Sequence, residues 1–192
     1  MDRVLIEKAR KFVESEIKKP TSNVPVDFIY DHLIPMEKHS KKLSNMLGGD
    51  KEIISLAVWL HDVGSIIYRR NDHHITSARI AQKFLEQEKY DSEKLKIVLD
   101  CIRHHRQSTN FKRTTIEEKI IADADAISNF DMLPGAFYAT LVVAKMTPIE
   151  AAKSVKKKLE SKWRRLHFKE SKELVRPKYN AAMLLLAEIT KL

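Results

Sequence analysis

The sequence predicts an all-α protein that folds as a single helical bundle. Glycine, which weakens helix interiors, occurs only four times in 192 residues, and two of the four are adjacent at Gly48 and Gly49. Over long segments, apolar residues recur every three or four positions, which is the period of a helix rather than of a strand. With 43% hydrophobic and 32% charged residues, the chain has enough apolar side chains to bury a core of its own.

The first two helical segments lie before the adjacent glycines. Residues 4–17 carry one apolar stripe, and Pro20 with the polar residues after it ends that helix. Residues 26–47 also have a helical pattern. Pro35 interrupts it, because proline lacks an amide donor and disfavours a helical backbone at the residue before it. We therefore expect a break or kink just after His32.

A strongly apolar helix follows the glycine pair. Asp50 is a suitable N-cap, and residues 53–60 are almost entirely apolar. This helix runs directly into the dipeptide His61 and Asp62. The sequence thus predicts an imidazole and a carboxylate at the end of a buried helix.

The remaining helices are expected at residues 74–90 and 92–106 and from Thr115 and Thr147 onward. Thr115 and Thr147 are each followed three positions later by glutamate, the spacing of a capping box. In the second box a proline occupies the first helical position, where its missing donor costs nothing. A long basic helix and a last apolar helix over residues 179–189 complete the chain.

No repeat, low-complexity tract or linker divides the chain. We predict one domain over residues 1–192, with a metal-site core at about 30–130 and a basic helical extension at 147–192. The N-terminal residues contain no apolar run of signal-peptide length, and no stretch reaches the length of a membrane helix. We therefore expect a cytoplasmic protein without a membrane partner. Its single cysteine, Cys101, lies in an apolar stretch and is expected to be a buried hydrophobe.

The histidines cluster in the first part of the chain. Seven of the eight lie within residues 1–105: His32, His39, His61, His73, His74, His104 and His105. A single histidine on an apolar face is usually a hydrogen-bonded core residue. The combination with Asp62 is different, because a buried carboxylate is costly unless a cation or hydrogen bonds satisfy it. A divalent metal ion would satisfy both groups.

The order of these motifs resembles the HD superfamily of metal-dependent phosphohydrolases. The resemblance consists of His32, then His61 and Asp62 within Ala-Val-Trp-Leu-His-Asp-Val-Gly, then Asp125 within Ala-Asp-Ala-Asp-Ala-Ile-Ser-Asn. It implies an HD-type helical bundle in which His32, His61, Asp62 and Asp125 bind a metal ion. Asp123 also fits the start of the last motif, but the register favours Asp125 and leaves Asp123 a structural carboxylate.

The resemblance also implies the chemistry. Mixed imidazole and carboxylate ligands suit Mn, Fe, Ni, Co, Zn or Mg. Such an ion activates water for attack on phosphorus. We therefore predict hydrolysis of a nucleotide or other small phosphorylated metabolite, by a phosphomonoesterase, a phosphodiesterase or a nucleotide pyrophosphohydrolase.

Some HD families bind a second metal ion through further histidines. Here the corresponding residues are Asp62 as a bridge, His73, and the pair His104 and His105, with His74 an alternative to His73. In relatives with one metal ion, histidines in these regions contact phosphate. We assign catalysis to Asp62, His73 and His104, and the sequence leaves open whether one or two metal ions bind.

Phosphate contacts are predicted from arginines. Many relatives have a lysine directly after the His-Asp-x-Gly segment, whereas this chain has Ser65. Arg69, Arg70 and Arg106 are the candidates for substrate binding, because a guanidinium group matches the geometry of a phosphate. Solvated surface positions are the alternative for each of the three.

The positive charge is concentrated near the C-terminus. Between residues 153 and 178, eleven basic side chains are accompanied by three acidic ones, a net +8 out of the +9 of the whole chain. Such a surface attracts nucleic acid or polyphosphate, but a solvated helix face is the favoured interpretation because Val155, Leu159, Trp163 and Leu166 have inward spacing. Two alternative functions remain. The resemblance also allows a di-iron oxygenase, because the same ligand order supports oxygen chemistry in a minority of the superfamily, and the basic helix allows a non-catalytic nucleic-acid-binding protein. The sequence leaves the oligomeric state open, and a homodimer is compatible with it.

Overall fold

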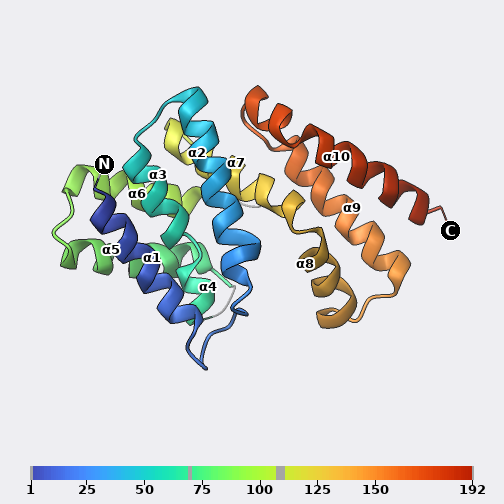
Figure 1. Cartoon of the computed structure of the whole chain (residues 1–192), viewed down its shortest axis with the longest axis horizontal. Coiled ribbons are helices and arrows are strands. Elements are labelled where there is room, and N and C mark those ends of the chain that lie inside the picture. The colour runs from blue at the N-terminus through green and yellow to red at the C-terminus, as the bar shows by residue number, and fades with distance from the viewer. Residues whose placement is uncertain (1, 69–70, 107–110, 192) are drawn as a thin grey trace.

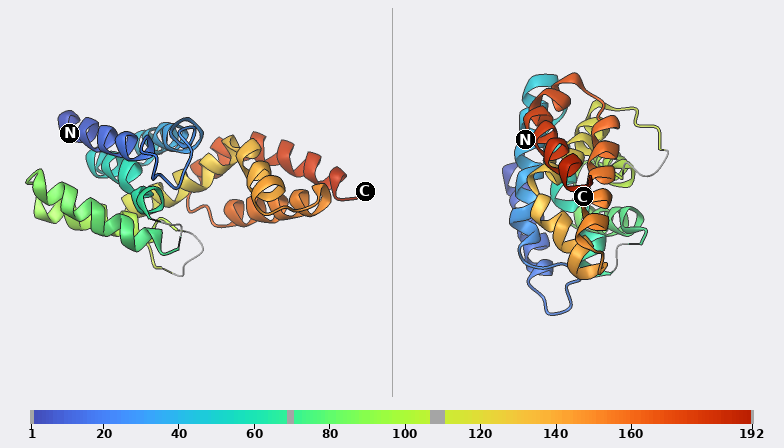
Figure 2. Two further views of the ribbon diagram at one scale, coloured as in Figure 1. Left: turned by 90° about the horizontal axis from the view of Figure 1, so that it is seen from below. Right: turned by 90° about the vertical axis from the view of Figure 1, so that its right-hand side faces the viewer.

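The prediction of an all-α fold is confirmed. The computed structural model describes residues 2–68, 71–106 and 111–191, and within these ranges it contains helices and no strand. Figure 1 shows one group of helices around the N-terminal half of the chain and a second group, α8 to α10, beside it. Figure 2 shows that the two groups lie end to end, so that the molecule is longer than it is wide.

Helix α1 (Arg3–Ile17) begins where Asp2 accepts hydrogen bonds from the backbone amides of Val4 and Leu5. It buries the stripe Leu5, Ala9, Val13 and Ile17, whereas Val4 is largely exposed. The stripe packs against α3, in keeping with the helical spacing of its apolar residues.

Of the break or kink predicted just after His32, the break is absent. Residues 29–33 form a π-helical turn (Ile29–Leu33) that continues without interruption into α2 (Ile34–Leu47), and Ile34 keeps helical backbone angles. Pro35 occupies the first turn of α2. The wider turn accommodates the proline, since the Ile34 amide donates to the Ile29 carbonyl, five residues earlier instead of four.

Helix α3 (Lys51–Leu60) is the centre of the N-terminal group. Asp50 caps it as predicted, through hydrogen bonds from two backbone amides, and the helix is buried beyond its first residue. The short helix α4 (Val63–Ile67) follows after a turn at His61 and Asp62. The two helices α5 (His73–Gln87) and α6 (Ser92–His104) pack against each other and complete this group.

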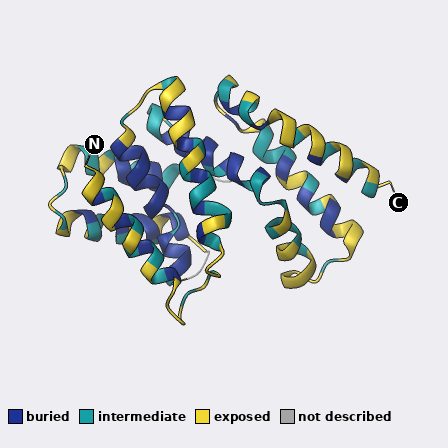
Figure 3. Ribbon diagram, in the orientation of Figure 1, coloured by how far each residue is buried: buried dark blue, intermediate teal, exposed yellow. Residues whose placement is uncertain are grey.

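Helix α7 (Ile116–Asp131) joins the two groups. It begins at the predicted capping box of Thr115 and packs against α2, α3 and α6 as well as α9 and α10. The chain then turns through α8 (Leu133–Tyr138) and a second π-helical segment (Ala139–Val143), neither of which contains a buried residue. Figure 3 shows the buried positions concentrated in α3 and α7.

The C-terminal helices α9 (Pro148–Arg164) and α10 (Lys169–Ile189) form an antiparallel pair (Figure 1). The capping box at Thr147 is present as predicted. The last helix differs from the prediction of residues 179–189, because α10 already begins at Lys169 and continues through Pro177. Among the described residues, no single helix meets the length and hydropathy required to span a membrane, and α7 joined to 133–143 does so only as a bent pair.

Candidate metal centre

Two histidines are positioned by the ends of helices. His61 follows the last residue of α3, and His105 follows the last residue of α6, where terminal carbonyls lack amide partners. Each ring donates its Nδ1 proton to such a carbonyl three residues earlier: His61 to Val58 at 2.8 Å and His105 to Ile102 at 2.7 Å. The other ring nitrogen, Nε2, therefore keeps its lone pair and is available as a metal ligand.

His32 is oriented by a hydrogen-bond relay from α7. The Ser128 hydroxyl donates to the Asp125 carbonyl at 2.8 Å, so the Nδ1 proton of His32 donates to the Ser128 oxygen at 3.1 Å. This relay again leaves Nε2 as the free nitrogen. The Nε2 atoms of His32 and His61 lie 3.1 Å apart.

Asp62 lies between two pairs of histidines. Its Oδ2 atom is 3.6 Å from His61 Nε2 and 3.8 Å from His32 Nε2. Its Oδ1 atom is 3.2 Å from His73 Nε2 and 3.8 Å from His105 Nε2, and it is buried without a hydrogen-bond partner. One carboxylate thus presents a different oxygen to each pair.

The described residues contain two groups whose donor atoms lie within 4.8 Å of one another: His32, His61 and Asp62, and Asp62, His73 and His105. The Nε2 atoms are 3.1 Å apart in the first pair of histidines and 3.2 Å apart in the second. Two imidazole ligands at bonding distance from one ion are separated by about 3.0 to 3.4 Å. Two lone pairs at 3.1 Å repel each other unless both bind the same cation. The donor set therefore fits a divalent metal ion.

Burial disfavours the charged forms of His32 and His105, and metal ligands must be neutral. It lowers the pKa of His32 to about 4, and the neighbouring His61 acts in the same direction. Burial and His61 likewise lower the pKa of His105 to about 3. Burial would raise the pKa of Asp62, but the surrounding histidines, His61 first among them, outweigh it and lower that pKa to about 2.

Asp125 and Asp123 have different surroundings in the structure. Asp125 faces the cluster, with Oδ1 3.7 Å from His32 Nε2 and Oδ2 2.8 Å from Lys162 Nζ. Burial opposes the ionisation of Asp125, but Lys162 and then His32 hold its pKa far below the usual range. Asp123 is fully buried elsewhere, where it accepts hydrogen bonds from the backbone amides of His167 and Phe168 and from the His167 ring.

Of the histidine pair on α6, the structure places His105 and not His104 at Asp62. The His104 Nδ1 atom lies 3.1 Å from Glu118 Oε1, and its ring packs on Phe111 with centroids 4.8 Å apart. Of the adjacent histidines at the start of α5, His73 contacts Asp62, whereas His74 packs against Phe111.

His39 and Arg106 also lie outside both groups. His39 contacts Asp131 at 2.5 Å. Arg106 follows His105, and its carbonyl accepts a hydrogen bond from Arg113. Arg69 and Arg70 lie outside the described residues.

Sequence reasoning missed Lys162, which was counted with the solvated basic residues, and the relay through Ser128. A signal for Lys162 was present. It stands three residues after Leu159 and four before Leu166, both of which are buried, so it shares the inward face of α9.

Comparison with known proteins gives relatives in bacteria. An uncharacterised protein of Clostridium beijerinckii is 30% identical over 111 residues, which make up 55% of this chain and 62% of that protein. The chain therefore matches less than two thirds of this relative's length.

Three crystal structures share the fold over nearly the whole chain. A protein from Lactobacillus plantarum has a TM-score of 0.78 and 14% identity, covering 100% of this chain and 97% of that one. A protein from Listeria innocua has a TM-score of 0.74 and 18% identity, with coverage of 97% and 93%. An HD-superfamily hydrolase from Bacillus thuringiensis has a TM-score of 0.73 and 20% identity, with coverage of 100% and 97%.

A match to a sequence profile identifies the family of this chain. The profile of the HD domain matches residues 29–129, which begin at the π-helical turn that carries His32 and end within α7. The matched range includes both groups of donor atoms and Asp125. Because the match extends over more than half of the chain, this protein belongs to the HD domain family.

Proposed function

We propose that this protein is a metal-dependent phosphohydrolase that acts on a nucleotide or another small phosphorylated metabolite. One observation carries the proposal: Asp62 presents Oδ2 to His32 and His61 and Oδ1 to His73 and His105. A carboxylate shared in this way suits two adjacent metal ions. Such pairs of ions assist displacement at phosphorus.

The chain's own residues supply the positioning. The carbonyls at the ends of α3 and α6 fix the rings of His61 and His105, and Ser128 fixes the ring of His32. Asp125 adds a carboxylate on the side of His32. A bound divalent ion would lower the pKa of its water ligand and polarise a phosphoryl oxygen.

The choice of metal follows from the ligand types. Imidazole and carboxylate ligands without thiolate suit Mn, Fe, Co, Ni, Zn or Mg. The two donor groups support up to two ions per chain. The HD-superfamily hydrolase from Bacillus thuringiensis, which shares the fold, adds support for hydrolysis as the reaction class.

The test combines metal analysis with a substrate screen. Gently purified protein is analysed for metal content, stripped with a chelator, and reloaded with Mn, Co or Ni. It is then assayed on a panel of phosphomonoesters, phosphodiesters and nucleoside triphosphates. We expect turnover of at least one class and its loss in Asp62→Ala, whereas Asp27→Ala, a change at an exposed aspartate, should retain it.

The alternatives give different results in the same test. Turnover of no phosphorylated compound with any cation would refute the proposal. Iron near two per chain with oxygen-dependent turnover would indicate a di-iron oxygenase. Steeply salt-dependent nucleic-acid binding that survives Asp62→Ala, without hydrolysis, would indicate a binding protein.

A further inference from the structure

Lys162 occupies an unusual position on α9. The inward side of this helix carries Val155 and Leu159, and Leu166 continues the same stripe in the turn that follows. Lys162 lies within this stripe, and its side chain is only 19% exposed. An ammonium group is seldom buried unless an anion accompanies it.

The accompanying anion belongs to the candidate metal centre. Lys162 Nζ lies 2.8 Å from Asp125 Oδ2, while the other carboxylate oxygen lies 3.7 Å from His32 Nε2. A cation from the C-terminal helices therefore shares a carboxylate with the histidine cluster. Lys162 and Asp125 are separated by 37 positions in the sequence.

The charge of Lys162 does not favour metal binding. Its ammonium repels a cation at the neighbouring donor atoms and competes with it for Asp125. In a loaded centre, two divalent ions outweigh the negative charges of Asp62 and Asp125, and Lys162 adds to the positive excess. The combination attracts an anion, and a lysine ammonium is a compact donor for phosphate.

We propose that Lys162 is the phosphate-contacting residue of this centre. While no metal ion is bound, the Lys162 ammonium neutralises the charge of Asp125. When Asp125 binds a metal ion, the ammonium donates a hydrogen bond to a phosphoryl oxygen of the substrate. The proposal rests on the proposed function and assigns a role to a residue of the basic C-terminal helices. It also supplies a cation to a site where Ser65 stands directly after the His-Asp-x-Gly segment.

The test compares Lys162→Met and Lys162→Gln with Lys162→Arg and with Lys157→Met, a change at an exposed position of the same helix. Manganese affinity is measured by competition with a fluorescent chelator. Binding of inorganic phosphate to the manganese-loaded protein is measured by calorimetry. Circular dichroism and thermal unfolding verify that each variant is folded.

We expect opposite effects on the two ligands. Both uncharged variants should bind phosphate about 10-fold or more weakly, which corresponds to one charge-assisted hydrogen bond, and should bind manganese at least as tightly as the wild type. In turnover they should raise KM for the phosphorylated substrate. Lys162→Arg should retain most of the phosphate affinity, and Lys157→Met should match the wild type.

Two results would overturn the assignment. Unchanged phosphate affinity in both uncharged variants would exclude the contact, and parallel loss of manganese and phosphate binding would show that Lys162 only supports the structure. Failure of the proposed function is distinguishable, because phosphate affinity is measured without turnover. Lys162-dependent phosphate binding by a protein that hydrolyses no phosphorylated compound would support the contact and refute the phosphohydrolase.

Discussion

The histidines of the candidate metal centre share one arrangement at the level of single residues. In His32, His61 and His105, Nδ1 donates to a protein oxygen and Nε2 faces the cluster. A hydrogen bond to the outer nitrogen fixes both the tautomer and the ring orientation of a metal ligand. Two of the three acceptors are carbonyls at a helix end, so the helices themselves orient His61 and His105. Of these three rings, His32 is the one oriented by another side chain.

Ser128→Ala should therefore weaken metal binding. The loss of the hydroxyl removes the acceptor for His32 Nδ1, and loss of such a partner lowers metal affinity by roughly 10-fold to 100-fold. Titration with Co²⁺, followed by absorption spectroscopy, measures the effect. Ser40→Ala is the control, because Ser40 is also buried and donates to a carbonyl three residues earlier, but is not part of the relay. Equal affinity in both variants would contradict the role of Ser128.

At the level of elements, the centre depends on how closely α4 approaches α5. The backbone of Gly64 lies directly against the start of α5, where its amide donates to the Ser77 hydroxyl at 2.8 Å. A Cβ atom at Gly64 would lie 2.2 Å from Thr76 Oγ1, 2.7 Å from Ser77 N and 2.8 Å from His73 O. The glycine after the His-Asp pair thus permits the contact that holds His73 near Asp62.

Gly64→Ala should force α4 and α5 apart. Overpacking of this kind costs about 1 to 3 kcal/mol, and the shift should separate His73 from Asp62. Denaturant unfolding and metal stoichiometry provide the two measurements, and we expect reduced stability together with loss of one metal ion. Gly135→Ala is the matched control, because its nearest atom is the flexible end of Met132 at 3.0 Å. A variant as stable as the wild type with full metal content would disprove the close-approach argument.

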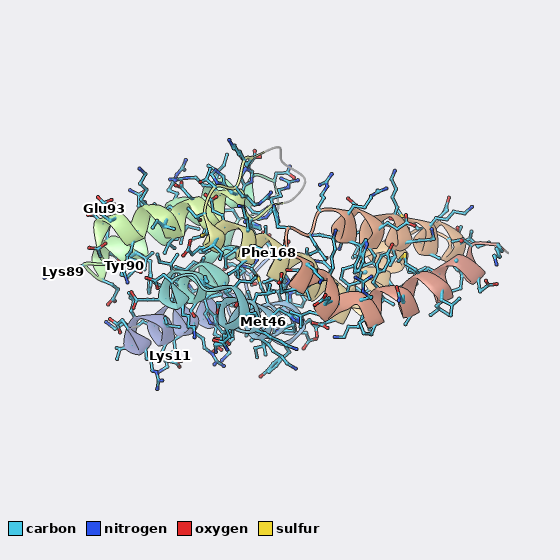
Figure 4. The ribbon with its side chains drawn as sticks, turned by 90° about the horizontal axis from the view of Figure 1, so that it is seen from above. Lys11, Met46, Lys89, Tyr90, Glu93 and Phe168 are labelled. Atoms are coloured by element: carbon cyan, nitrogen blue, oxygen red, sulfur yellow. The ribbon has the colours of Figure 1, made fainter. Side chains whose placement is uncertain are left out.

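At the level of the whole molecule, a buried carboxylate ties the two groups of helices together. Asp123 of α7 accepts hydrogen bonds from the backbone amides of His167 and Phe168, which lie in the turn between α9 and α10. Figure 4 shows Phe168 where this turn meets the N-terminal group, whereas Lys89, Tyr90 and Glu93 lie at the far end of the molecule. The same turn follows directly after the part of α9 that carries Lys162.

Asp123→Asn should loosen the C-terminal helices. An asparagine side chain has one oxygen acceptor, so it can accept only some of the hydrogen bonds that the carboxylate accepts. We expect the free energy of unfolding to fall by roughly 3 kcal/mol or more. Hydrogen exchange should rise first in α9 and α10. Glu160→Gln, which alters only a surface pair with Lys156, should change little. If hydrogen exchange in α9 and α10 is the same in Asp123→Asn as in Glu160→Gln, Asp123 does not act as the link.

Much of the fold could be predicted because its signals are local. The capping boxes at Thr115 and Thr147 start the expected helices, since a side chain three residues away completes each cap. The continuous helix through Ile34 could not be predicted in this way. A π-helical turn accommodates Pro35, and that geometry depends on packing rather than on residue type.

The sequence by itself determined the helical class, the HD family, and the position of His61 and Asp62 at the end of a buried helix, because periodicity, caps and motif order are properties of neighbouring residues. Only the tertiary structure decided that His105 and not His104 faces Asp62, and that Lys162 reaches Asp125. Adjacent side chains on a helix point in directions about 100° apart, so the packing of α6 and α9 against their partners selects which one enters the centre.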